Sequence, residues 1–404
     1  MSLEILSIGS ELLLGHTLNS NFCFAGELFA AHGIVPSRET CVHDEREIVC
    51  EAVQEALSRV KIVLTIGGLG PTRDDLSREA VADALGVELQ FCQETADLVR
   101  SRSRNRAPNE KSVHAQAHLP SGAVALENSV GTAPGLWCEH GDNVVVMLPG
   151  PPREFQAMLR DEVLPRVLAQ LEPTVVTETI RVYGLRETDV EMETERVLAE
   201  FANVSPAYCV NFGRTDVRVS VPVAESAELA AAVVALRDGF GDKVVDDGLV
   251  DAIACNIRKR GWTFGTAESC TGGGIAACIT ELAGISDVFA GSAVTYSNEM
   301  KQVLLGVPKT TLDAHGAVSE ETATAMLRGL CERLGVQAGV AVTGIAGPGG
   351  GTPEKPVGLV YIGSIVDGEI QVERHQFSGD RESVRGRIIM RALNQLRCQL
   401  ARHT

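Results

Sequence analysis

Several features that would place a protein in a common class are missing from this 404-residue sequence. No segment reaches the ~18 uninterrupted apolar residues that a membrane-spanning helix needs. The N-terminus has neither a basic region nor a small-residue cleavage site, so we expect no signal peptide. The 11 cysteines include no C-x-x-C pair, which favours reduced thiols over a disulfide framework. These absences predict a cytoplasmic protein without membrane contact.

Three well-known catalytic signatures are also absent. The sequence has no H-E-x-x-H zinc motif, no Walker A motif and no G-x-G-x-x-G between a strand and a helix. His114 and His118 are four residues apart, but without a third ligand we interpret them as a solvated helix face. Kinase, zinc protease and dehydrogenase functions therefore lose most of their support.

Positive charge is scarce as well. The net charge is −17, which opposes binding to nucleic acid or to an anionic membrane. Any anionic ligand must then be held by local groups. A hydrophobic content of 45% with a mean hydropathy of +0.08 indicates a packed globular protein. A chain of 404 residues exceeds what one core usually supports, so two or three domains are expected.

The pattern of apolar runs divides the chain into three blocks. Residues 1–171 alternate buried strands with amphipathic helices, which predicts a doubly wound α/β domain with a parallel sheet. Residues 172–247 alternate apolar and polar positions in two strands and add two helices, which predicts a small α+β connector or dimerisation domain. Residues 248–404 return to α/β alternation.

Carboxylates follow several predicted strand ends in the first block. The stretch "GGLGPTRDD" runs from a buried strand into a glycine turn and then a predicted helix, a setting that suits phosphate. Asp74 and Asp75 end this stretch, while Glu11 and Glu154 follow two other strands. Because parallel strand ends converge on one crevice, these acids predict a site for a divalent cation and a phosphate.

Ser269 lies in "TAESCTGGG", where a strand breaks into a glycine turn before a helix. It is interpreted as a nucleophile, a phosphate contact or a helix cap, because G-x-S-x-G itself is absent. With no histidine motif nearby, Lys301 in "VTYSNEMK" is the candidate base, since a desolvated lysine can activate a serine. Tyr296 would relay a proton or orient the lysine, and Ser286 competes as nucleophile or helix cap.

The motifs together resemble one family. "AESCTGG", "VTYSNEMK", "HGAVSEET", "VTGIAGPGGGTPEKPVG" and "SGDRE" are similar to the C-terminal domain of the CinA (competence/damage-inducible protein A) family. "IGSELLLGHTLNSN", "GGLGPTRDDLS", "NSVGTAPG" and "LPGPPREF" are similar to its N-terminal, molybdenum-cofactor-biosynthesis-like domain. The resemblance follows family order along nearly the whole chain.

This resemblance implies two activities. The C-terminal domain would deamidate nicotinamide mononucleotide to nicotinate mononucleotide and ammonia without a cofactor. The N-terminal domain would hydrolyse ADP-ribose to AMP and ribose 5-phosphate with Mg²⁺, Mn²⁺ or Co²⁺, and K⁺ is a further candidate cation. The middle block resembles the family's KH-type domain but lacks a GXXG loop, which favours a homodimer contact over RNA binding.

The resemblance also implies the site residues. The deamidase positions would be Ser269, Thr271, Ser286, Tyr296, Lys301 and Arg381. The substrate contacts of this domain would include Gly272, Gly273, Thr343 and Gly344. Those of the N-terminal domain would include Gly67, Gly68, Gly70, Thr72, Asn109 and Lys111, with Glu11, Asp74, Asp75 and Glu154 as metal ligands.

Two departures and two alternatives accompany this interpretation. The family pattern G-P-T-E-D-D has Arg73 here, which puts the pyrophosphatase in more doubt than the deamidase, and N-P-V-G-T-A-P-G has Ser129. A molybdopterin-binding transferase and a non-enzymatic adaptor linked to competence are the alternative functions. The net charge of −17 opposes direct DNA binding by such an adaptor.

Overall fold

The computed structural model describes residues 2–72, 75–102 and 109–403. The chain forms two compact units, one of residues 1–177 with 220–226 and the other of residues 178–219 with 227–404. Within the described ranges, no helix is long and apolar enough to cross a membrane. The predicted mixed α/β architecture is confirmed, and each of its three larger sheets lies within one of the three expected blocks.

The first unit is built on a six-stranded sheet in the order β2-β1-β3-β8-β7-β6. Its strands are β1 (Leu3–Ile8), β2 (Arg38–Val42), β3 (Ile62–Ile66), β6 (Val124–Leu126), β7 (Gly135–His140) and β8 (Asn143–Leu148). The first four in this order are parallel, as predicted, whereas β7 and β6 pair antiparallel. The parallel prediction was wrong for that edge because short connections between β6, β7 and β8 can only reverse the chain.

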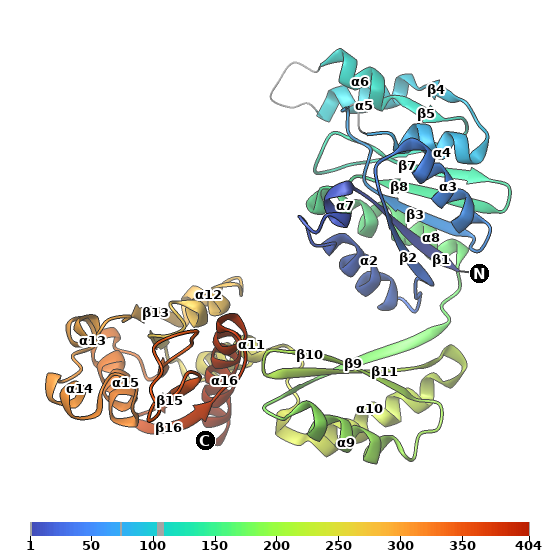
Figure 1. Cartoon of the computed structure of the whole chain (residues 1–404). Helices are drawn as coiled ribbons and strands as arrows, with labels where there is room; N and C mark the ends of the chain where they lie inside the picture. Colours follow the sequence, from blue (N-terminus) through green and yellow to red (C-terminus); the bar gives the residue numbers. More distant parts are fainter. Residues whose placement is uncertain (1, 73–74, 103–108, 404) are drawn as a thin grey trace. The chain divides into compact units, whose positions relative to one another are not determined.

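Helices cover both faces of this sheet (Figure 1). One face carries α2 (Ser20–Ala30), α7 (Pro152–Met158) and α8 (Leu164–Gln170), and the other carries α3 (Arg46–Leu57) and α4 (Ser77–Leu85). Phe29 and Phe155 are fully buried in the first of these layers, and Val53 and Val81 in the second. Two apolar layers around a central sheet leave the strand ends as the place for polar side chains.

Smaller elements complete the first unit. They are α1 (Ser10–Leu13), β4 (Leu89–Phe91), α5 (Gln93–Arg102), α6 (Glu110–Gln116), β5 (His118–Pro120) and a π-helical turn (Leu159–Val163). His114 lies in α6 and His118 begins β5, so the two histidines do not share a helix face as predicted. The Nδ1 atom of His118 instead lies 2.7 Å from the carbonyl oxygen of His114.

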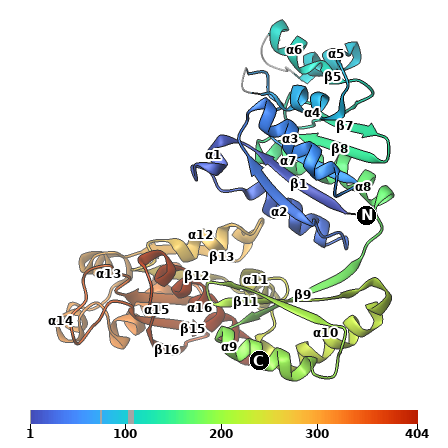
Figure 2. The ribbon, with the colours of Figure 1, turned by 45° about the vertical axis from the view of Figure 1, so that its right-hand side comes forward.

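The middle block contains the two predicted helices and three strands, one more than predicted, and its residues divide between the two compact units. It consists of β9 (Val175–Tyr183), α9 (Glu187–Leu198), β10 (Ser205–Asn211), β11 (Arg214–Pro222) and α10 (Ser226–Phe240). The strands pair in the order β10-β11-β9. Both helices lie on one face of this sheet (Figure 1, Figure 2). The alternate residues Val217, Val219 and Val221 of β11 are accordingly buried.

The last block contains a five-stranded sheet in the order β13-β12-β14-β15-β16. Its strands are β12 (Phe264–Glu268), β13 (Phe289–Val294), β14 (Ala338–Gly344), β15 (Leu359–Val366) and β16 (Glu369–Gln376). β13, β12 and β14 are parallel, while β15 and β16 are antiparallel. The carboxyl ends of three strands therefore meet at one edge of the sheet.

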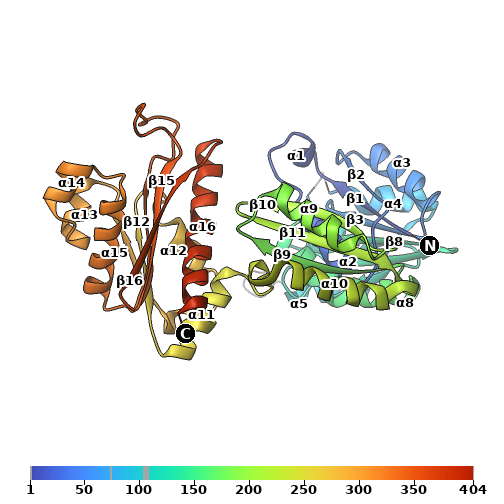
Figure 3. The ribbon, with the colours of Figure 1, turned by 90° about the horizontal axis from the view of Figure 1, so that it is seen from below.

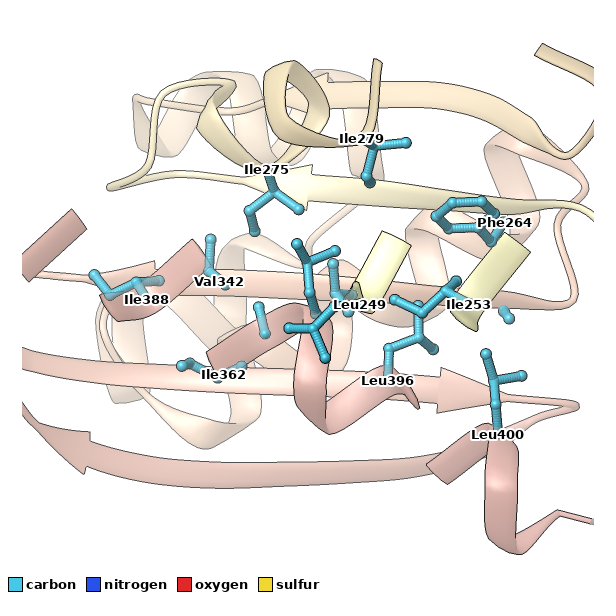
Figure 4. Close-up of a cluster of buried hydrophobic side chains, with 14 of the residues drawn as sticks. Leu249, Ile253, Phe264, Ile275, Ile279, Val342, Ile362, Ile388, Leu396 and Leu400 are labelled. Atoms are coloured by element: carbon cyan, nitrogen blue, oxygen red, sulfur yellow. The ribbon is translucent and has the colours of Figure 1, made fainter. Parts of the chain in front are cut away.

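Helices cover both faces of this five-stranded sheet (Figure 3). One face is covered by α11 (Leu249–Arg260), α12 (Gly274–Thr280) and α16 (Arg381–Arg402), the other by α13 (Asn298–Leu305), α14 (Lys309–His315) and α15 (Glu320–Leu334). Figure 4 shows Ile253, Phe264, Ile275, Val342 and Leu396 meeting in the first of these cores. All five are fully buried, which contributes about 1.5–3 kcal/mol for each large side chain.

Candidate active site

Ser269 lies in a tight turn between β12 and α12. The strand ends at Glu268 and the helix begins at Gly274. Gly272 and Gly273 have φ angles of +62° and +93°, in the left-handed region that glycine adopts without strain. The turn therefore requires glycine at these positions, and it places Ser269, which is 8% exposed, at the edge where the parallel strands end.

A buried carboxylate organises this turn. Glu268 is fully buried, and its side chain accepts hydrogen bonds from the N–H groups of Gly273, Ile275 and Ala276 at 2.8–3.1 Å. It also accepts a hydrogen bond from the Thr271 hydroxyl at 2.7 Å. The first N–H groups of a helix lack intrahelical partners and favour a negative charge. The sequence analysis missed Glu268, although an acid directly before a glycine turn and helix is the signal that could have found it.

Lys301 approaches the serine from α13. Its Nζ lies 3.0 Å from Ser269 Oγ and 2.8 Å from the carbonyl oxygen of Thr295. The Lys301 side chain is 1% exposed. Burial lowers the pKa of this amine below its ordinary 10.5, because the charged form loses its hydration. The structure thus brings together the two groups that the sequence predicted as nucleophile and base.

The hydrogen bonds of the turn decide which N–H groups remain for a substrate. The Gly272 N–H donates to the Ser269 carbonyl at 3.1 Å, and the Gly273 N–H donates to Glu268. The expectation that these two glycines present their N–H groups to a ligand was therefore wrong, because the turn itself uses them. Among the described residues, no carbonyl or carboxylate accepts from the N–H groups of Cys270 and Thr271. These two lie directly after the serine, the position that contributes an N–H group to the oxyanion hole in α/β-hydrolases.

Cys270 beside the serine does not act as a competing nucleophile. The residue is buried, and burial raises the pKa of its thiol to about 12. Because only the thiolate attacks carbonyl carbons and binds metals effectively, a protonated Cys270 is chemically inert here.

Two threonines have structural tasks. Thr271 is fully buried and donates to Glu268, while its carbonyl accepts from Arg385 at 2.6 Å. Thr343, at the end of β14, is 1% exposed and donates to the Ala317 carbonyl at 2.6 Å. Gly344 ends β14. All three residues lie at the same edge of the sheet as Ser269, since Glu268 pairs with Val342 in register.

Tyr296 and Arg381 form the outer part of the site. An Arg381 guanidinium nitrogen donates to the Tyr296 hydroxyl at 3.1 Å, and another donates to the Gly347 carbonyl at 2.7 Å. Tyr296 is 64% exposed. This pair ties the start of α16 to the chain that follows β13. Tyr296 makes no hydrogen bond to Lys301 among the described residues, so the expected orienting role passes to the Thr295 carbonyl.

Ser286 is not part of this site. β12 and β13 are parallel, with Phe264 opposite Phe289 and Glu268 opposite Val294. Ser286 precedes β13, whereas Ser269 follows β12, so the two hydroxyls lie at opposite ends of the sheet. At about 3.3 Å per residue, a five-residue strand separates them by about 15 Å. Ser286 is exposed in a 3-10 turn, which corrects its candidacy as nucleophile.

The first unit has a cavity of about 390 Å³ at the carboxyl ends of its parallel strands. Gly67, Gly68 and Gly70 line it, together with Glu11, Asp75 and Glu154. Arg78, which is 3% exposed, fixes the glycine turn by donating to the carbonyls of Leu69 and Gly70. The predicted convergence of glycines and acids at this edge is therefore observed.

The acids of this cavity are only partly free to bind a cation. An Asp75 oxygen accepts from the N–H of Thr72 at 2.9 Å, and Glu154 accepts from Asn128 at 2.6 Å. Within the described ranges, no three His, Cys, Asp or Glu side chains are close enough to hold one ion. Glu11, Asp75 and Glu154, three of the four predicted ligands, therefore do not lie close enough together to bind one ion. Asp74, like Arg73, lies outside the described residues.

Other predicted contacts of this cavity lie elsewhere. α4 begins at Ser77, so Asp75 precedes the helix in which it was expected. Asn109 caps α6 by accepting from the Lys111 N–H at 3.1 Å, and both side chains are exposed outside the cavity lining. Gln116, which is 2% exposed, does line the cavity and was missed.

Comparisons with known proteins match both halves of the chain. Residues 246–400 match the CinA C-terminal domain, and residues 4–169 match the probable molybdopterin binding domain. A CinA-like protein of Kosmotoga olearia is 38% identical over 98% of each chain. A putative competence-damage inducible protein of Moorella thermoacetica is 40% identical over 97% of each chain.

Solved structures match part of the chain. The competence/damage inducible protein CihA of Agrobacterium tumefaciens is 41% identical, covers 38% of this chain and 93% of its own, and has a TM-score of 0.37. A CinA superfamily protein of Klebsiella pneumoniae is 36% identical, covers 38% of this chain and 96% of its own, and has the same TM-score of 0.37.

Proposed function

Because the chain belongs to the CinA family, we propose that its C-terminal domain is an amidohydrolase that converts nicotinamide mononucleotide to nicotinate mononucleotide and ammonia. The observation that carries the proposal is the buried contact between Lys301 Nζ and Ser269 Oγ at 3.0 Å. Amide hydrolysis without histidine or metal needs an activated hydroxyl, a base and an oxyanion hole. The turn after β12 would supply the hydroxyl of Ser269 and the N–H groups of Cys270 and Thr271, and Lys301 of α13 would supply the base.

The first half-reaction forms an ester on the serine. The neutral Lys301 amine accepts the Ser269 proton, and Ser269 Oγ bonds to the carboxamide carbon. The carbonyl oxygen becomes negative and accepts hydrogen bonds from the N–H groups of Cys270 and Thr271. The tetrahedral species then expels ammonia, which takes the proton held by Lys301.

The second half-reaction releases the acid. A water molecule gives a proton to Lys301 and attacks the ester carbon, and Ser269 Oγ leaves with that proton returned to it. The Thr295 carbonyl holds the amine in place throughout, since it accepts from Nζ at 2.8 Å. Arg381, at the start of α16, offers a guanidinium for the substrate phosphate at the rim of the site.

The test measures ammonia released from nicotinamide mononucleotide by wild type and by Ser269→Ala. We expect the variant to lose at least about 1000-fold in rate, as for other nucleophile removals. Ser286→Ala is the matched control and should retain the wild-type rate. An active Ser269→Ala protein would refute the role of this serine, and an inactive wild type would refute the deamidase.

A second candidate function belongs to the first unit. Its cavity places a glycine turn beside three carboxylates, a combination that supports hydrolysis of the pyrophosphate of ADP-ribose to AMP and ribose 5-phosphate. One or two of Glu11, Asp75 and Glu154 would hold a divalent cation, with substrate phosphates as the remaining ligands, as is usual for Mg²⁺. The cation would neutralise phosphate charge during hydrolysis.

This activity is tested by AMP formation from ADP-ribose with Mg²⁺, Mn²⁺ or Co²⁺. We expect Glu154→Gln to lower the rate by about 100-fold or more, because it removes one carboxylate of the cavity. Glu94→Gln, an exposed position of α5, is the control. No AMP with any of the three cations would refute the proposal, and a copurifying pterin would favour the transferase alternative.

A further inference from the structure

Two adjoining cavities in the second unit have no role in the proposed reaction. One measures about 470 Å³ and lies between the turn after β9, the β10–β11 hairpin and α16. The other measures about 340 Å³ and shares Gly184, Arg391 and Asn394 with the first. We call the two together the basic groove. Neither is lined by any residue of the Ser269 turn.

The groove is positively charged in a chain whose net charge is −17. Its walls contain the basic residues Arg186, Arg214, Lys243, Arg387, Arg391, Arg397 and Arg402. The acidic lining residues are Glu187, Asp242 and Glu373. Seven basic residues against three acidic ones make this a local exception to the acidic surface, and such a field concentrates anions.

Three of these charges, those of Arg387, Arg397 and Arg402, have no ion pair among the described residues, while Lys243 pairs with Asp242. Arg186, Arg214 and Arg391 each pair with a carboxylate, namely Asp189, Asp216 and Glu373. Arg387 instead donates to the Ser378 carbonyl at 2.6 Å and has no ion pair in the described part of the chain. A guanidinium matches the geometry of phosphate oxygens, which two of its N–H groups can contact together.

One buried donor at the groove lacks an acceptor. The Nε of Arg391 is buried without a hydrogen-bond partner among the described residues. Beside it, Asn394 is 7% exposed, and its Oδ1 accepts from Arg397 at 3.0 Å. Because buried N–H groups are nearly always satisfied, the unpartnered Arg391 Nε calls for an acceptor from outside the chain.

The backbone leaves access to the Asn394 amide. Gly184 has a φ of +79°, and a Cβ at this position would lie 2.9 Å from Asn394 Nδ2. Glycine therefore both adopts the turn without strain and leaves the space in front of the amide open. The lining of the larger cavity also includes the apolar side chains of Val210, Met390 and Phe377. The Phe377 ring stacks on His375 with centroids 5.5 Å apart.

We propose that the basic groove binds a nucleoside phosphate, a ligand that the deamidase reaction does not use there. Its phosphates would accept hydrogen bonds from Arg387, Arg391 and Asn394, and its planar base would lie against the apolar wall at Phe377. An aromatic wall suits any nucleobase, since every base has a π face.

The groove is connected to the catalytic turn through α16. This helix carries Arg387, Arg391 and Asn394 in the groove. Nearer its N-terminal end, the same helix carries Arg381, which donates to Tyr296, and Arg385, which donates to the Thr271 carbonyl. A ligand bound in the groove therefore contacts the helix that also positions Arg381 at the outer part of the Ser269 site.

The experiment titrates ADP into the full-length protein by calorimetry. The variant is Arg387→Gln, and the matched control is Arg374→Gln, an exposed arginine whose neighbours in β16, Glu373 and His375, point to the opposite face. ADP bound at other sites is common to both proteins, so their difference reports the groove. We expect Arg387→Gln to weaken one binding event about tenfold or more, since a charged hydrogen bond is lost.

Four outcomes would overturn the proposal. They are identical isotherms for the two variants, adenosine binding as tightly as ADP, inorganic phosphate binding as tightly as ADP, and a single-stranded oligonucleotide binding more tightly. Identical isotherms would show that the groove does not bind ADP, and equally tight adenosine binding would show that the phosphates make no contact. Equally tight binding of inorganic phosphate would show that the nucleoside contributes nothing. Tighter binding of the oligonucleotide would show that the ligand is larger than a nucleoside phosphate. Unchanged deamidation by Arg387→Gln confirms that the variant is folded, because Arg387 is not in the catalytic machinery.

Discussion

A lysine side chain usually reaches into solvent, and Lys301 does not. Its side chain is 1% exposed, its amine lies between a serine hydroxyl and a main-chain carbonyl, and no carboxylate of the described residues contacts it. A buried amine without a counter-charge favours its neutral form, which is the form that accepts a proton. A lysine that formed a salt bridge with an acidic side chain would stay protonated and could not act as the base.

The pH dependence of deamidation follows from this environment. Because burial lowers the pKa of Lys301 below 10.5, kcat/KM should rise with pH up to that pKa and level off before 10.5. Lys301→Arg, which stays protonated, should lose about 100-fold or more. A stopped assay of ammonia between pH 6 and pH 10 checks both, and a rate that falls with rising pH would contradict the role of base.

The same shift has a consequence for stability. The unfolded chain keeps the ordinary lysine pKa, so it binds more protons than the native state between the lowered value and 10.5. The free energy of unfolding contributed by Lys301 therefore rises with pH across that window.

At the residue scale, sequence reasoning identified what motif and chemistry specify. Ser269 follows from a hydroxyl at a glycine turn and Lys301 from the lack of a histidine motif nearby, whereas Arg381 was implied only by the resemblance to the CinA family. It could not exclude Ser286, because only the register between β12 and β13 shows that the two serines lie at opposite ends of the sheet. It also could not show that Gly272 and Gly273 donate their N–H groups to acceptors within the turn.

At the scale of elements, the position of the base depends on how α13 packs against α15. Gly329 of α15 lies against the main chain of Leu305, the last residue of α13, and a Cβ there would come within 1.8 Å of the Leu305 carbonyl oxygen. Backbone cannot swing aside as a long side chain can. The contact therefore sets the distance between the two helices and, with it, the position of Lys301.

Gly329→Ala should accordingly affect both stability and catalysis. We expect the free energy of unfolding to fall by about 1–3 kcal/mol from overpacking, and kcat to fall as α13 moves. Gly26→Ala in α2, where a Cβ meets nothing within 4 Å, should instead stabilise by about 0.5–1 kcal/mol. Denaturant unfolding and the ammonia assay measure the pair, and a neutral Gly329→Ala would refute the close contact.

Elements were predicted best where periodicity and end signals agree. α15 begins after Ser319, whose hydroxyl accepts from the Thr322 N–H, and ends at Leu334 before Gly335 in the left-handed region, which are start and end signals that a sequence shows. The helix start at the paired aspartates and the helix through His118 were predicted wrongly, because acids suit the first turn of a helix and the two histidines have helical spacing. Local propensity cannot anticipate the tertiary contacts of Ser77 with the Gly67 carbonyl.

At the scale of the whole molecule, the two compact units divide the two proposed activities between them. The cavity with Glu154 lies entirely in the first unit and the Lys301–Ser269 pair entirely in the second. Each core is complete within its own unit. Units with separate cores can unfold in separate steps.

Scanning calorimetry should therefore resolve two transitions. Nicotinamide mononucleotide added to Ser269→Ala, which binds without turnover, should raise the midpoint of one transition only. At 100 times its Kd the stabilisation would be about 2.7 kcal/mol. ADP-ribose should raise the other transition. A single transition, or an equal shift of both by one ligand, would show that the units are coupled.

The buried thiol next to the serine also makes the protein easy to label. Reagents that alkylate cysteine need an exposed thiolate, and Cys270 provides neither exposure nor a thiolate. Cys23, Cys209 and Cys255 are exposed. Fluorophores or spin labels can thus be attached to native cysteines in both units without first replacing the other cysteines. Cys270 in the turn after β12 should not react with the label.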